Sequence, residues 1–421
     1  MRWSWVALAG LSGCADTGGV EARPSGAAPP PALSLRLAPP VAGEVWTATA
    51  VGATPGASVS LVLGEAVGAG ACLPALGGGC LGVTGAARRI GVARADAGGV
   101  ARWSLPLPAA APWGGVALEA IQLSGLLRSD ANEAWVQTPG RTERGVWFWT
   151  APGDPYGAAA IVGDAAAEAA MVADLDRWSV RRVYGSYDWS GAPDARIAAF
   201  HQRLGADRTV ELLLGENSWL LPATWPGLDA ILQRRIADFH AATPPDAWFD
   251  GVHLDIEPHA LADWSALPPS DKRRRLAELA AAYAHVRDWL DTHGFSALTL
   301  RSDIATWYDN LPPALGGTGS VGWTSVADRD YYFQDLCDVL DGVTLMTYER
   351  DSVASIQSGA AWERANMPCE VRASVDTWVG PGATWPDVEQ MITVASGVED
   401  AWGTGEGLDL HHWASFRGEL P

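Results

Sequence analysis

The chain has 421 residues, 48% of them hydrophobic, and is long enough for two domains or for one barrel-sized domain with an appendage. Its 29 basic and 49 acidic residues give a net charge of -20, which repels nucleic acids and anionic membrane surfaces and argues against a polyanionic substrate. The 22 Trp, against 8 Tyr and 7 Phe, offer flat faces on which sugar rings can stack, although ordinary packing accounts for most of them.

The first 14 residues, MRWSWVALAGLSGC, place one Arg before an apolar stretch of about ten residues, too short to span a bilayer, and predict an export signal. The LSGC run ending at Cys14 resembles a bacterial lipobox, which implies that Cys14 is acylated after cleavage. A plain secretory signal and an incorrectly assigned start codon are the alternatives. Residues 15–32, rich in Gly, Pro and Ala, predict a flexible linker. We therefore expect a protein anchored by lipid to the outer membrane or cell surface, with no other membrane contact.

The other four cysteines form two groups that are local in sequence. Cys72 and Cys80 bracket a Gly-rich loop, while Cys337 precedes one predicted strand and Cys369 opens the next. In an exported protein each group predicts a disulfide, and two buried free thiols are the alternative for the second group. The spacing of Cys and His does not suggest zinc, and we expect neither a metal nor an organic cofactor.

Residues 33–140 consist of short runs of alternating apolar and polar residues, separated by Gly, Pro and Asn turns. This pattern predicts a β-sandwich of about a hundred residues. It resembles the immunoglobulin-like accessory modules of bacterial envelope proteins in general pattern only. Trp103 and Trp113 leave a carbohydrate-binding module open as an alternative to a structural spacer.

From residue 145 to 421 predicted strands alternate with helices, of which 270–294 is the clearest, with apolar residues three and four apart and a Gly stop. The eight predicted strands are 145–152, 180–189, 209–217, 249–258, 297–305, 341–350, 369–378 and 408–416. This number predicts an α/β TIM (β/α)8 barrel following the all-β sandwich. A doubly wound open sheet is the alternative, but no Gly-rich phosphate loop follows the first strand.

The fourth predicted strand carries polar residues into an apolar run, in WFDGVHLDIEPH (248–259). Because side chains alternate along a strand, His253, Asp255 and Glu257 share one face, which in a barrel is the interior. Active sites of such barrels lie at the C-terminal ends of the strands, and Glu257 comes last on this one. The pattern therefore predicts that Asp255 and Glu257 are catalytic residues.

Other predicted strand ends bring acidic and aromatic residues to the same mouth. These residues, which we expect to bind substrate together with His253, are Trp149, Glu216, Asp303, Glu349, Asp376, Trp378 and Trp413. An acidic, aromatic mouth suits glycoside hydrolysis, which needs one carboxylic acid to protonate the leaving oxygen and a second group as nucleophile or base. For any one of these residues, a capping or buried hydrogen-bonding role is the alternative.

Two segments at the expected strand numbers resemble a known family. DGVHLDIE is similar to the DGxDxDxE signature on the fourth strand of family 18 glycoside hydrolases, the chitinases and their relatives, and LMTYER resembles that family's Met-x-Tyr-Asp segment. The resemblance implies that Glu257 is the catalytic acid and that Asp250 matches the outer aspartate. It also implies that Asp255 steadies the substrate's acetamido group, whose oxygen is the nucleophile, and that Tyr348 helps to hold this group.

The chain departs from the family pattern at several positions. His253 occupies the middle aspartate of the signature, Ile256 and Pro258 replace the usual aromatic pair, and Glu349 stands for the aspartate after the tyrosine. Because His253 stands in place of an aspartate, it changes the charge that sets the pKa of the expected acid, Glu257.

A more distant glycosidase barrel, with Glu216 or Asp303 as its second carboxylate, is therefore an alternative within the same class. The sequence predicts a monomeric O-glycosyl hydrolase acting on a neutral polysaccharide or an N-acetylated glycan. A non-catalytic carbohydrate-binding or structural barrel is the alternative from another class, and His253 is its main support.

Overall fold

A computed structural model of the chain describes residues 33–38, 40, 43–107, 114–136, 143–190, 194–403 and 407–419. The predicted signal segment and linker, Cys14 and Trp113 lie outside the described residues. Within the described part, none of the helices combines the length and hydrophobicity needed to cross a membrane.

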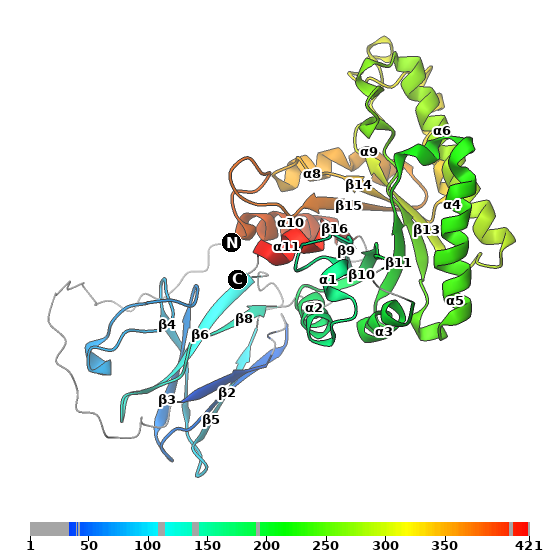
Figure 1. Cartoon of the computed structure of the whole chain (residues 1–421). Coiled ribbons are helices and arrows are strands. Elements are labelled where there is room, and N and C mark those ends of the chain that lie inside the picture. The colour runs from blue at the N-terminus through cyan, green and yellow to red at the C-terminus, as the bar shows by residue number, and fades with distance from the viewer. Residues whose placement is uncertain are drawn as a thin grey trace.

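Two antiparallel sheets, blue to cyan in Figure 1, precede the barrel. One contains β1 (Ser34–Leu37), β2 (Val45–Val51) and β5 (Val100–Pro106); the other contains β4 (Arg88–Arg94), β3 (Ser58–Gly64), β6 (Gly114–Gln122), β7 (Leu127–Arg128) and β8 (Asn132–Val136). Buried Leu, Val, Ala and Trp side chains from both sheets form one hydrophobic cluster, so the sheets pack face to face as the alternating pattern predicted. Trp103 lies in that cluster and is only 4% exposed, so one of the two residues behind the alternative of a carbohydrate-binding module has no face available for a sugar.

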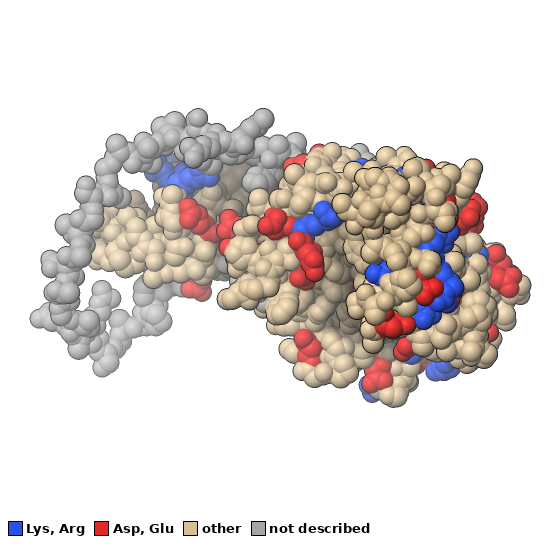
Figure 2. Space-filling view, turned by 90° about the horizontal axis from the view of Figure 1, so that it is seen from above, with Lys and Arg blue, Asp and Glu red and all other residues tan. Residues whose placement is uncertain are grey.

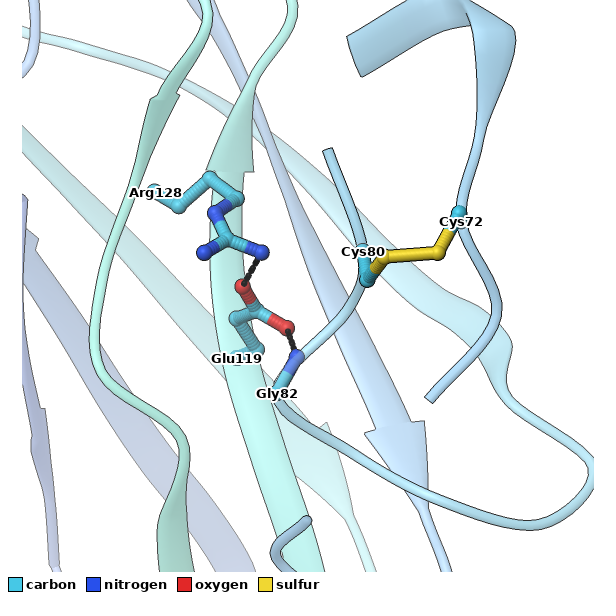
Figure 3. Close-up of a disulfide and its surroundings, with 5 residues drawn as sticks. All are labelled: Cys72, Cys80, Gly82, Glu119 and Arg128. Carbon is cyan, nitrogen blue, oxygen red and sulfur yellow. Dashed lines mark hydrogen bonds and ion pairs between the residues drawn. A yellow bond between two sulfur atoms is a disulfide. The ribbon is translucent and has the colours of Figure 1, made fainter. Parts of the chain in front are cut away.

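Between β3 and β4 the chain forms a small lobe that contains the Cys72–Cys80 disulfide (Figure 3). The lobe is also fastened to β6 by Glu119, whose carboxylate accepts the Gly82 N–H at 2.7 Å and lies 3.6 Å from Arg128. Burial raises the pKa of Glu119, and these two partners oppose the shift. The disulfide therefore closes the lobe on itself, and the buried carboxylate attaches the lobe to β6.

The Cys337–Cys369 disulfide is also present and ties α7 (Val326–Val339) to the start of β15 (Glu370–Asp376), so both predicted bridges are confirmed.

The Cys337–Cys369 bridge joins residues 32 apart in the sequence, whereas Cys72 and Cys80 are 8 apart. Because a bridge restricts the unfolded chain more when its loop is longer, replacing Cys337 and Cys369 by Ser should lower the free energy of unfolding by about 3–4 kcal/mol, against about 2–3 kcal/mol for Cys72 and Cys80. Urea denaturation of the two double variants measures both losses. A larger loss for the shorter bridge would contradict this ranking.

The remaining strands close into a parallel barrel in chain order, with β16 pairing back to β9 (Figure 1, green to red). Its strands are β9 (Arg144–Phe148), β10 (Val180–Gly185), β11 (Thr209–Leu214), β12 (Gly251–Leu254), β13 (Thr299–Ala305), β14 (Gly342–Met346), β15 and β16 (Leu408–His411). The α/β barrel predicted from the strand count is confirmed, and the open sheet is excluded. The last predicted strand was too long, because β16 ends at His411 and a helix begins at Trp413.

Helices surround this barrel. They are α1 (Ala158–Ile161), α2 (Ala165–Arg177), α3 (Asp194–Leu204), α4 (Trp225–Leu232), α5 (Asp238–Ala242), α6 (Pro269–Thr292), α7, α8 (Val353–Gly359), α9 (Ala361–Asn366), α10 (Val388–Trp402) and α11 (Trp413–Glu419). The largest hydrophobic cluster contains Val252 and Leu254 of β12 together with Leu276 and Leu279 of α6, so the aliphatic face of the strand points outward, toward the helices. Helix α6 ends where Gly294 adopts a φ of +86°, a conformation that favours glycine.

The barrel interior is filled by charged side chains, where most such barrels have branched aliphatic ones. Buried or half-buried members are Arg182, Glu211, Arg301, Glu370, Arg372 and Asp409. The Arg372 Nε lies 3.0 Å from both oxygens of Asp409, which also accepts the Tyr184 hydroxyl at 2.9 Å. Burial alone would raise the pKa of Asp409, but Arg372 outweighs it and holds the pKa below its usual value. These ion-paired side chains fill the barrel beneath its C-terminal mouth, and we call them the charged floor.

Figure 2 shows one face of the molecule, where most of the drawn surface is uncharged. Acidic side chains lie there in several small groups, some beside basic side chains and some alone. The chain has a net charge of -20, but its acidic residues do not form one large patch on this face.

Candidate active site

Asp255 and Glu257 follow directly after strand β12 and lie at the C-terminal mouth of the barrel. The Asp255 N–H donates to the Leu214 carbonyl at 2.8 Å, and the Glu257 N–H donates to Asn217 Oδ1 at 2.7 Å. A Cβ at Gly215 would lie 3.0 Å from the Asp255 carbonyl oxygen, so glycine allows this close approach of the two chains. The backbone of both acids is therefore fixed by the end of β11 and by the turn that follows it.

Below them, His253 is fully buried between two carboxylates. Its Nε2 lies 3.0 Å from Asp303 Oδ1, and its Nδ1 lies 3.5 Å from Glu211 Oε2. Burial lowers the pKa of His253, but Asp303 and Glu211 outweigh it and raise the pKa to about 9. At neutral pH an imidazolium thus stands where the family signature has an aspartate.

Asp303 links this imidazolium to the mouth. Its second oxygen accepts the Trp147 indole N–H at 3.1 Å. Burial, followed by repulsion from Asp303, raises the pKa of Asp255 well above its usual value and also raises the pKa of Glu257. The charge of Glu257 adds to the rise in the pKa of Asp255, so the pair holds a proton to a higher pH than free carboxyls do.

Tyr348 and His411 stack beside the acids, with ring centroids 4.4 Å apart. Burial raises the pKa of Tyr348 well above its usual value, and Asp303 and Asp255 add to the shift, so the hydroxyl stays protonated. Burial lowers the pKa of His411 to about 4, so this imidazole is neutral at pH 7. Tyr348 can therefore offer a neutral hydrogen-bond donor.

The predicted rim residues differ in their surroundings. Glu216 and Glu349 are exposed, and Glu216 caps a short helical turn by accepting the Ser218 N–H at 3.2 Å. Half-buried Asp376 accepts the N–H of Trp378, whose side chain is 63% exposed. Trp149 packs, half-buried, against the cluster that contains Trp147. Their roles toward a substrate remain predictions.

Trp413 requires a correction. It opens α11, is 1% exposed and packs in the hydrophobic core near Phe416, so it has no face available for a sugar ring. The sequence pattern placed it on a strand, where alternation would have brought it to the mouth.

Asp250 lies at the start of β12, at the opposite end from the mouth, and its carboxylate accepts the Val210 N–H at 2.8 Å. It therefore joins two strands. Trp147 and His259 were not singled out from the sequence, although each lies two residues from a selected one, Trp149 and Glu257 respectively. Among the described residues no cluster of three His, Cys, Asp or Glu side chains is arranged to hold a metal ion.

The buried imidazolium gives a testable pH dependence. The folded-state pKa of His253, about 9, exceeds the usual unfolded value of about 6.5. Its contribution to stability is therefore complete below pH 6.5 and is lost as the pH rises through 9, by up to about 1.4 kcal/mol per unit. Urea denaturation between pH 6 and 9 should show this decline and a flatter dependence for His253→Gln. Parallel profiles would contradict an imidazolium at this position.

No family model matches the sequence, and no curated protein matches it either. Solved structures are similar to it at low identity. An endo-β-N-acetylglucosaminidase from Cordyceps militaris is 14% identical over 64% of this chain and 80% of that chain, with a TM-score of 0.39. A family 18 N-acetylglucosaminidase from Paenibacillus barengoltzii is 15% identical over 56% and 68%, with a TM-score of 0.32. A plant β-glucan endohydrolase is 12% identical over 64% and 90%, with a TM-score of 0.41.

Proposed function

We propose that the protein is a glycoside hydrolase in which Glu257 is the general acid and Asp255 is its partner. The observation that carries the proposal is the position of this pair directly after β12, at the C-terminal mouth of a parallel barrel. The raised pKa of both carboxyls, caused first by burial, supports a proton being available near neutral pH.

In the proposed reaction Glu257 gives its proton to the glycosidic oxygen as the bond to the anomeric carbon breaks. On an N-acetylated sugar the acetamido oxygen forms the new bond to that carbon, and Asp255 steadies the acetamido group. Water then attacks the anomeric carbon, whose bond to the acetamido oxygen breaks, and Glu257 takes a proton from this water, which restores the acetamido group and returns the enzyme to its first state. The hydroxyl of Tyr348 is proposed to donate a hydrogen bond to the substrate.

The remaining features fit an exported enzyme of this kind. We propose that residues 1–14 direct export, with Cys14 as lipid anchor, and that residues 15–32 tether an accessory sandwich and a catalytic barrel to the outer membrane or cell surface. The substrate is proposed to be a neutral polysaccharide or an N-acetylated glycan. Exposed Trp378 would supply a stacking face at the rim.

A second candidate is a carbohydrate-binding barrel without catalysis. The observation that favours it is His253, because a buried imidazolium reverses the charge at the middle signature position. The retained Asp255 and Glu257 favour the hydrolase.

The test is incubation of the full chain with tetra-N-acetylchitotetraose, peptidoglycan glycan fragments and β-glucan oligosaccharides. Mass spectrometry should detect shorter products from one of these substrates in the wild type. Calorimetric binding of one oligosaccharide without cleavage would support the binding barrel, and neither binding nor cleavage would contradict both candidates.

A further inference from the structure

His259 lies between the proposed acid and a buried phenol. It sits in the short turn Pro258–Ala260, and its Nε2 is 3.9 Å from Glu257 Oε1. Its Nδ1 is 2.7 Å from the Tyr308 hydroxyl, and its ring packs edge-on against Trp307 with centroids 5.5 Å apart. Tyr308 and Trp307 therefore fix the imidazole with its Nε2 toward Glu257.

The surroundings of Tyr308 decide which nitrogen of His259 carries the proton. Tyr308 is 1% exposed, and burial raises its pKa well above the usual value, so it keeps a proton to donate. Burial lowers the pKa of His259, which is therefore neutral at pH 7. A neutral imidazole that accepts from Tyr308 at Nδ1 carries its proton on Nε2, the atom that faces Glu257.

We propose that His259 is a positioning residue whose Nε2–H stabilises the carboxylate formed when Glu257 gives up its proton. The inference rests on the proposed function of Glu257. At 3.9 Å the contact is longer than a hydrogen bond, and it shortens as charge develops on Glu257. The proton stays on His259 throughout, so the residue acts by electrostatic stabilisation.

His259 differs from the other groups around the acid. The titratable groups that interact with Glu257 are Asp255, Asp303, Tyr308, Tyr348 and His259. Ionised Asp303 disfavours a charge on Glu257, and an ionised Asp255 does the same. The Nε2–H of His259 favours that charge and so limits the rise in the pKa of Glu257.

The test is a carboxyl 13C NMR titration of the full chain labelled at Glu, with the Glu257 resonance identified by its loss in Glu257→Gln. In His259→Phe, which keeps an aromatic ring against Trp307, the pKa of Glu257 should rise by about half to one unit. His259→Gln restores an N–H and should return the pKa toward the wild-type value. Tyr308→Phe, which frees the imidazole to change tautomer, should give a smaller rise and serves if His259→Phe does not fold.

His285→Phe is the matched control, since His285 also contacts a carboxylate, Asp229, at 2.7 Å and stacks on Trp225. It should leave the titration of Glu257 unchanged. An unchanged Glu257 pKa in His259→Phe, or an equal shift in the control, would overturn the proposal.

Kinetics on a cleaved oligosaccharide provide a second readout. In His259→Phe, kcat should fall about tenfold, and the basic limb of kcat/KM should move to higher pH because the acid has become weaker. The NMR titration needs no substrate. Absence of cleavage would therefore count against the proposed function alone, while the titration still decides the role of His259.

Discussion

Replacing Glu257 by Gln is expected to slow glycoside hydrolysis by about two to four orders of magnitude, the usual range for loss of general acid catalysis. The amide keeps the size of the side chain, and the backbone hydrogen bond to Asn217 is unaffected, so folding should change little. Sugar binding should survive, because the change removes the proton and leaves the shape of the mouth. Initial rates measured together with calorimetric binding separate the two effects.

Asp255→Asn should also impair turnover, and the double variant should be little slower than the slower single one, because the two carboxyls act as a unit. Glu278→Gln is the control, since Glu278 lies on α6 and pairs with Arg274 at 3.0 Å, outside the site. Hydrolysis at the wild-type rate by Glu257→Gln would remove this residue from the mechanism.

Replacing Arg372 by Met is expected to lower the free energy of unfolding by about 3–5 kcal/mol, because it leaves the charge of fully buried Asp409 without its main partner. Tyr184 and the Gly145 N–H would still donate to Asp409 and limit the loss. Without Arg372 the pKa of Asp409 should rise, so the deficit should shrink at acid pH. Urea denaturation at pH 5 and pH 7 measures both effects.

Arg274→Met is the matched control for this experiment. Arg274 pairs with Glu278 at the surface, where its side chain is 55% exposed, and its removal should cost less than about 1 kcal/mol. An Arg372→Met variant no less stable than Arg274→Met would show that the interior ion pairs add little to stability. Replacing Arg372 and Asp409 together by apolar residues should recover part of the loss, since no unpaired charge then remains.

The barrel could be predicted because its signals are local. Strand-length apolar runs recur between helical segments, and α6 has a clear amphipathic pattern and a Gly stop. The inward direction of His253, Asp255 and Glu257 follows from alternation along one strand, and the contacts of His253 inside the barrel confirm its direction. The disulfides also follow from proximity in sequence and from the predicted export.

The partners of these residues could not be predicted, because they depend on the register between strands. Nothing local to His253 identifies Asp303 or Glu211 as its neighbours, 50 residues onward and 42 residues back in the sequence respectively. Trp413 was misplaced because the apolar run continues past His411, where the strand gives way to a helix. Trp103 was misplaced because alternation alone does not say which face of a sheet meets the other sheet.

The charged floor of the barrel also bears on the order of folding. Arg372 on β15 meets Asp409 on β16, and Asp409 meets Tyr184 on β10 and the Gly145 N–H on β9, so the first and last strands complete the same set of contacts. A partial barrel that lacks β16 would have to bury Arg372 without Asp409, its main partner, at a cost of several kcal/mol. Stable partial barrels are thereby disfavoured, and the eight strands should assemble in a single cooperative transition, with the barrel part of any fragment that ends before residue 408 remaining unfolded.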